Sequence, residues 1–177
     1  MRSTLSLTAM LLAGLAAVPA GASAAPAPCT RSAAVLSPKT QLLGYADEHS
    51  DFYADYGGAH ELDFGVGQLI CANFDGVAGS EMVVQLLCCT GGSPTPWGIF
   101  TRDATGAWKL QYARPADNVW RISLKGPTVA ARQPAVYNGA CTDHFRDRVV
   151  RYDSARRAYR SRLTPTYVRR APRSCYA

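Results

Sequence analysis

The sequence lacks the motifs by which most secreted enzymes and metal proteins are recognised. It has no C-x-x-C pairs, which excludes the usual cysteine zinc site. It has no G-x-S-x-G, which excludes a hydrolase nucleophile elbow. His60-Glu61 begins like a zinc-protease motif, but Phe64 stands where the second histidine ligand is required. The sequence therefore assigns no catalytic residue by motif.

Long apolar runs are also scarce. The only one, Leu5 to Val18, follows a single cation at Arg2 and precedes the small residues Ala22-Ser23-Ala24. This pattern predicts a signal peptide over residues 1–24, cleaved before Ala25. Since no second run follows, we expect no transmembrane segment in the mature chain. The sequence thus predicts a secreted, extracellular or cell-envelope protein.

Every cysteine follows the predicted signal peptide. An even number of cysteines in an exported chain predicts disulfides, because thiols oxidise outside the cytoplasm. Neighbours on a strand point to opposite faces, so the adjacent Cys88 and Cys89 are expected to bond to different partners. The six predicted disulfide cysteines are Cys29, Cys71, Cys88, Cys89, Cys141 and Cys175. One plausible set of pairs is Cys71 with Cys88, Cys89 with Cys141, and Cys29 with Cys175, and the other connectivities stay open.

A cysteine close behind an export signal can instead carry a lipid. The residues before Cys29 are Ala25-Pro26-Ala27-Pro28, which lack the leucine-led box that lipid attachment uses. We therefore expect Cys29 to carry no lipid anchor.

Charge divides the chain into two parts. Between Thr40 and Thr101 there are eight acids and no Lys or Arg, whereas sixteen bases and five acids follow from Arg102 onward. One interpretation is that the charges are solvated or paired across the surface. The other is that the arginine-rich part binds an external polyanion such as teichoic acid, an acidic polysaccharide or nucleic acid.

The pattern along the chain predicts a mainly β (α+β) fold. Ser37-Pro38 is typical of a helix start, and the helix is expected to run to about Glu48. Residues 49–64 look irregular. Apolar runs and alternating stretches then predict antiparallel, hairpin-linked strands over 82–89, 97–102, 107–112, 120–124, 128–132, 145–152 and 159–163.

The predicted organisation is a single disulfide-stapled domain. Residues 25–34 are expected to form a flexible arm that is tied down only if Cys29 is bonded. The β-rich domain spans 35–165, and residues 166–177 form a basic C-terminal tail. We expect a monomer.

An acidic loop precedes the valine-rich strand. Asn73, Asp75 and Gly76, followed by Glu81, offer oxygen ligands and a glycine turn of the kind a calcium loop requires. The segment resembles the turn of FG-GAP and VCBS-type repeats, and that resemblance implies Asn73, Asp75 and Glu81 as calcium ligands. The alternative is a hairpin turn in which Asn73 and Asp75 bond to backbone amides, with no cofactor.

A wider likeness covers roughly residues 65–163. The acidic turn, the valine strand and the stretch from Val136 to Cys141 before a tyrosine-rich hairpin resemble secreted actinobacterial proteins of the LppP/LprE lipoprotein type. The resemblance implies an envelope-associated or secreted β-rich protein without catalysis. It assigns no functional residues, and the lipid-attachment box of that group is missing here.

Four arginines have the best geometry for binding. Arg146 and Arg148 share one strand parity, and Arg160 and Arg162 share one parity on the next strand. With a turn centred near 153–157, both pairs are expected on one face as a cationic ladder that a polyanion would stabilise. The alternative is a solvated face that prevents edge-to-edge aggregation.

The favoured function is therefore a non-enzymatic binding protein for an extracellular or cell-wall polyanion. One alternative is a small secreted hydrolase that uses residues 47–63, which requires His49, His60 or His144 beside a carboxylate in a cleft. In a ribonuclease, Glu61, His144 and one of the arginines would supply the general base, the general acid and the phosphate-binding cation. Another is an enzyme inhibitor that inserts the loop from Gly91 to Trp97 into its target.

Overall fold

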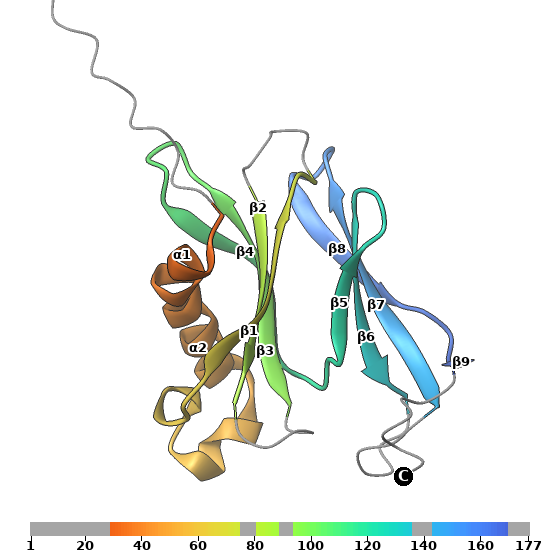
Figure 1. Ribbon diagram of the computed structural model, residues 1–177, viewed down its shortest axis with the longest axis horizontal. Helices are drawn as coiled ribbons and strands as arrows, with labels where there is room; N and C mark the ends of the chain where they lie inside the picture. The colour runs from red at the N-terminus through yellow and green to blue at the C-terminus, as the bar shows by residue number, and fades with distance from the viewer. Residues whose placement is uncertain (1–28, 75–80, 89–93, 136–142, 170–177) are drawn as a thin grey trace, which may run out of the picture.

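The computed structural model describes residues 29–74, 81–88, 94–135 and 143–169. The predicted signal peptide, residues 1–24, lies outside the described part. Figure 1 shows three layers: the helices at the left, a first sheet in the middle and a second sheet at the right. Both sheets are antiparallel, so the predicted mainly β fold is confirmed. Within the described residues, no helix is long and apolar enough to cross a membrane.

Two α-helices and two 3-10 helices form the first layer. Helix α1 spans Arg31–Val35 and α2 spans Ser37–His49, followed by η1 at Asp51–Tyr56 and η2 at Ala59–Glu61. The predicted helix is confirmed, but its cap is Leu36 and not Ser37. The Ser37 hydroxyl instead accepts a hydrogen bond from Gln41 Nε2 at 2.7 Å.

The first sheet, sheet A, has the strand order β1-β2-β3-β4. Its strands are β1 (Gly65–Ala72), β2 (Glu81–Leu87), β3 (Thr95–Arg102) and β4 (Trp108–Asp117). Strand β2 is buried on both faces, because one face packs on the helices and the other on the second sheet. The continuous apolar run therefore predicted a buried strand correctly.

The second sheet, sheet B, has the order β5-β6-β7-β8, and β9 pairs with the start of β7. Its strands are β5 (Arg121–Leu124), β6 (Thr128–Pro134), β7 (His144–Asp153), β8 (Ala158–Leu163) and β9 (Tyr167–Val168). Strand β9 lies in the segment that the sequence assigned to the C-terminal tail, and this part of the tail is thus held against β7.

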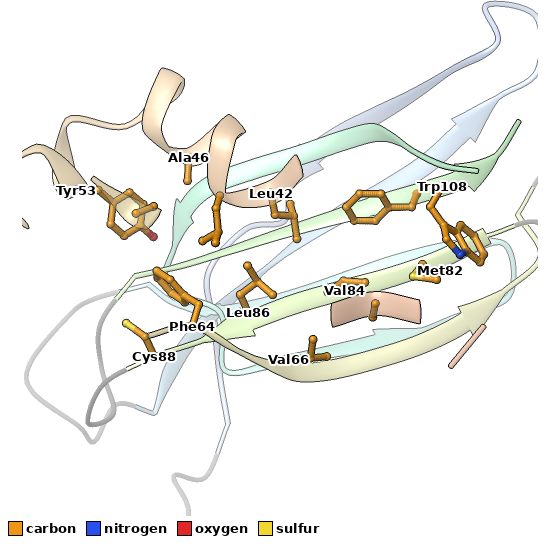
Figure 2. Close-up of a cluster of buried hydrophobic side chains, with 14 residues drawn as sticks. Leu42, Ala46, Tyr53, Phe64, Val66, Met82, Val84, Leu86, Cys88 and Trp108 are labelled. Carbon is orange, nitrogen blue, oxygen red and sulfur yellow. The ribbon is translucent and has the colours of Figure 1, made fainter. Parts of the chain in front are cut away.

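Two hydrophobic cores join the three layers. Figure 2 shows the first, where Leu42 and Ala46 of α2 and Tyr53 of η1 meet Val84 and Leu86 of β2. The second core lies between the sheets, where Trp97 and Ile99 of β3 pack against Ile122, Val129 and Val150 of sheet B. Each face of sheet A is therefore covered.

The disulfide pairing differs from the predicted set. Cys29 bonds to Cys71, with a Cα–Cα distance of 5.8 Å, which contradicts both the Cys71–Cys88 and the Cys29–Cys175 pairs. Cys88 is buried in the first core (Figure 2). Cys89, Cys141 and Cys175 lie outside the described residues. Because its Sγ is in the disulfide, Cys29 has no thiol left for lipid attachment.

The bonded Cys29 ties down the described end of the predicted arm. Residues 31–35 form α1, and Ala34 is buried in the first core. The Arg31 guanidinium donates to the carbonyls of Val66 and Gly67 on β1. The arm therefore covers the outer edge of β1.

Glutamine side chains form hydrogen bonds with the backbone at two further sheet edges. Gln68 of β1 accepts from Ile122 N–H at 2.9 Å and donates to the Trp120 carbonyl at 3.4 Å, which links sheet A to the outer edge of β5. Gln41 of α2 accepts from Leu110 N–H at 3.0 Å and donates to the Trp108 carbonyl at 2.8 Å, on the outer edge of β4. A primary amide offers one donor and one acceptor side, so it can replace a neighbouring strand at such a site.

Candidate polyanion-binding surface

The register of the β7–β8 hairpin decides which arginines share a face. Arg151 lies opposite Arg160, and Val149 lies opposite Arg162. Residues directly opposite each other on neighbouring strands point to the same face. Arg151, Arg160 and Arg162 therefore share the outer face of sheet B, the face turned away from sheet A. We call these three residues the arginine surface.

The predicted four-arginine ladder is wrong. Arg148 lies opposite Leu163 and shares the face of Val150, which packs in the core between the sheets. Arg146 has the same parity as Arg148, so both point away from the face that carries Arg160 and Arg162. The physical reason is the length of the loop between the strands. Asp153 and Ala158 are the paired residues next to the turn, so four residues form the loop. A loop of this length places odd-numbered residues of β7 opposite even-numbered residues of β8.

The arginine surface is exposed and only partly neutralised. All three of its side chains are exposed. Asp153 binds Arg160 Nε at 3.2 Å and Arg156 Nη1 at 3.0 Å. Neither Arg151 nor Arg162 has an acidic partner within the described part of the chain. Two unpaired guanidinium groups are thus held beside a third on one strand pair.

A shallow depression lies within this surface. It has a volume of about 340 Å³ and is lined by residues of β7 and β8, including the three arginines, Val149 and Asp153. The lining is mostly apolar, because Val149 and the aliphatic stems of the arginines form its walls. Charged groups around an apolar floor suit an anion that also presents a hydrophobic or ring-shaped body.

One of the inward arginines, Arg148, binds at the junction between the sheets. Asp117, at the end of β4, accepts from Arg148 Nε at 3.0 Å, Gln133 Nε2 at 2.7 Å and Trp97 Nε1 at 3.2 Å. Arg114 Nε lies 3.4 Å from the other carboxylate oxygen. Arg148 thus pairs with a buried carboxylate, so it does not offer a free cation to a ligand.

The far end of the outer face is a packed cluster. Asp147 is buried, and it accepts from the Tyr167 hydroxyl at 2.6 Å, with Arg132 Nε at 3.5 Å and Lys125 Nζ at 3.8 Å. Burial, and then the hydrogen bond to Asp147, raises the pKa of Tyr167 above its ordinary value, so the hydroxyl remains a donor further into the alkaline range. The acid here compensates the neighbouring cations, unlike the situation at Arg151 and Arg162.

Two histidines of the predicted hydrolase site, His60 and His144, each lie beside a carboxylate. His60 Nδ1 and the Ala59 N–H both bond to the Asp47 carboxylate, which fastens η2 to the end of α2. His49 stacks on Tyr45 within α2. His144 bonds to Asp143 at the start of β7, in sheet B, and Figure 1 shows sheet A between that sheet and the helices. The structure therefore does not bring His144 and Glu61 together.

The predicted calcium ligands Asn73 and Glu81 differ in how deeply they are buried. Glu81 is fully buried, and its carboxylate accepts from the Phe74 N–H at 2.8 Å and the Tyr159 hydroxyl at 3.2 Å, whereas Asn73 is exposed. Asp75 lies outside the described residues. In the described ranges, no three or more His, Cys, Asp or Glu side chains gather as a metal site would require.

The predicted inhibitor loop is described only at its C-terminal end. Residues 91–93 lie outside the described ranges. Thr95, Pro96 and Trp97 belong to β3 and are buried, and the Trp97 side chain is fully enclosed between the sheets. These three residues are therefore not available for insertion into a target.

Comparisons with protein-family models, with curated proteins and with solved structures find no match for this chain.

Sequence reasoning named two residues of the arginine surface, Arg160 and Arg162, and missed Arg151. The signal for Arg151 was the loop length, since an even number of loop residues reverses the parity between the two strands. Counting four loop residues from Ser154 to Arg157 would have placed Arg151 opposite Arg160.

Proposed function

We propose that this protein is secreted or envelope-associated and binds an extracellular polyanion, without catalysis, through the arginine surface. The observation that carries the proposal is the direct pairing of Arg151 with Arg160 on an exposed face. Like charges opposite each other destabilise a strand pair, and an anion between them removes that cost. The disulfide and the absence of a membrane-spanning helix in the described residues are compatible with this location.

Arginine suits this role better than lysine. Its planar guanidinium binds phosphate, sulfate or carboxylate in two-point contact and is always charged. We infer that a chain of repeated anionic groups would place one group between Arg151 and Arg160. The next group would lie near Arg162, which is two residues further along β8 and so about 7 Å away.

The test is binding of heparin and of poly(glycerol phosphate) teichoic acid across a salt series. The variant R151A/R162A removes the two cations that have no acidic partner. We expect its affinity to fall roughly tenfold or more, and the wild-type affinity to fall steeply with salt as counterions are released. The matched control is K39A/K109A, which removes the same charge from α2 and β4 and should bind within about twofold of wild type. Equal losses in both variants would overturn the arginine surface as the site.

A further inference from the structure

The four edge strands of the two sheets differ in whether side chains bond to their outward backbone groups. Strand β1 is covered by Arg31, β5 by the Gln68 amide and β4 by the Gln41 amide. The Tyr53 hydroxyl adds a further bond to β4, at the Pro115 carbonyl. The remaining edge is β8, and within the described chain no side chain bonds to its outward backbone groups at Ser161 and Leu163.

The hydrogen-bond pattern shows which groups of β8 point outward. The Thr164 N–H donates to the Asp147 carbonyl at 2.9 Å, and the Asp147 N–H donates to the Thr164 hydroxyl at 2.8 Å, so the backbone groups of these two residues face each other across the two strands. Bonded and non-bonded pairs alternate along an antiparallel ladder. Arg160 and Arg162 therefore direct their backbone groups to β7, whereas Ser161 and Leu163 direct theirs away from the sheet. Both residues are exposed.

Space is available beside this edge. A cavity of about 440 Å³ lies between α2, β4 and β8, and its lining includes Tyr45, Tyr112, Arg114 and Ser161. Side chains of an added strand that point inward would enter this cavity. Side chains that point outward would lie beside Arg160 and Arg162.

We propose that the outer edge of β8, which none of the described residues covers, is a second interaction surface, which binds an extended peptide segment with acidic side chains at alternate positions. Exposed edges bind such segments through backbone hydrogen bonds, and pockets for alternate side chains give specificity. A second copy of β8 is disfavoured because its arginines would repel these arginines. In an antiparallel addition, residues opposite Arg160 and Arg162 occupy non-bonded pairs, where the Cα atoms approach to about 4.5 Å. Acidic residues suit those positions.

The peptide proposal rests on the proposed function in that both use Arg160 and Arg162. Peptide binding also needs the backbone groups of Ser161 and Leu163, which polyanion binding does not, so either proposal can be wrong while the other holds. The probe is a synthetic peptide of alternating Thr and Glu, with two N-methylated forms. Methylation of the Thr amides removes the donors that face Ser161 and Leu163, and we expect it to weaken binding roughly tenfold or more. Methylation of the Glu amides alters donors that face solvent and should leave affinity within about twofold. Equal affinities for both methylated forms, or no binding of the unmethylated peptide, would overturn the proposal.

A protein variant gives an independent reading. S161P removes an outward N–H and no ladder bond, which edge strands tolerate. We expect S161P to lose the Thr–Glu peptide and S161A to retain it. Ser161 also lines the depression in the arginine surface, so the two methylated peptides, which leave the protein unaltered, are the measurement that separates this edge from the polyanion site. Equal peptide binding by S161P and S161A would contradict the proposal that the peptide binds at the edge of β8. If S161P folds poorly, the methylated peptides test the same proposal on the unaltered protein.

Discussion

At the scale of single residues, one glycine sets how closely the helices approach sheet A. A Cβ built on Gly98 would lie 2.7 Å from the Tyr112 carbonyl oxygen and 2.9 Å from Leu42 Cδ2 of α2. Such distances are shorter than real Cβ contacts, so the backbone of β4 at Tyr112 would have to move, and the Leu42 side chain as well. Gly98 is therefore required for packing, since its φ is not in the left-handed region.

Two glycine substitutions should have opposite effects on stability. G98A is expected to lower the free energy of unfolding by about 1–3 kcal/mol because the added methyl overpacks the first core. G44A adds a methyl with nothing within 4 Å, and it should raise stability by about 0.5–1 kcal/mol through helix propensity. Urea denaturation of both variants measures the difference. A neutral G98A would show that the β4 backbone and the Leu42 side chain can shift without cost.

At the scale of elements, the β7–β8 hairpin carries strain at its tip. Arg157 has a φ of 50°, the one positive φ of a non-glycine residue in the described ranges. This left-handed conformation costs an L-residue roughly 1–2 kcal/mol. The chain nevertheless has an arginine there, next to Arg156 and close to the arginine surface.

Replacing Arg157 should change the stability of the protein and its polyanion affinity in opposite directions. R157G is expected to raise the free energy of unfolding by about 1 kcal/mol, since glycine adopts positive φ freely. Polyanion affinity should fall by less than in R151A/R162A, because Arg157 lies in the loop outside the strand pair. Thermal unfolding and heparin affinity in the same buffer measure both effects. A stability loss in R157G would mean that its side chain makes contacts that outweigh the strain.

Hairpins were the elements that the sequence predicted best. Trp97 to Arg102 and Ala107 to Tyr112 flank a short turn that ends in Gly106, whose φ of 83° explains the signal. Register was harder, because a shift of one loop residue moves every side chain to the other face. That shift is why Arg146 and Arg148 were assigned to the wrong face. Cys29 and Cys71 were correctly predicted to be disulfide-bonded, but their pairing was missed because cysteine spacing carries no information on which elements lie side by side.

At the scale of the whole molecule, a buried carboxylate joins the two sheets. Asp117 belongs to β4, yet Gln133 and Arg148 of sheet B both donate to it. The side chains of Asp117 and Arg148 are 9% and 14% exposed, so each charge depends on the other. Removing one partner of a buried pair leaves the second charge uncompensated.

Asp117 is therefore expected to be essential to sheet docking. D117N should lower the free energy of unfolding by about 3–5 kcal/mol, because Arg148 then lacks a counter-charge. D153N, which removes an acid with exposed partners on the hairpin, should cost less than about 1 kcal/mol. Chemical denaturation compares the two variants. A similar small cost in both would show that Arg148 finds solvent or another acceptor.

The layer order also gives the molecule an electric polarity. Acids dominate the helical layer, from Asp47 to Asp63, and arginines dominate sheet B, with sheet A as a spacer. Charges separated in this way form a permanent molecular dipole across the layers. Near a negatively charged wall or fibre, the dipole turns the outer face of sheet B toward the surface before contact is made. The protein would then reach the surface already oriented, and fewer encounters would bring the acidic helical layer into contact with it.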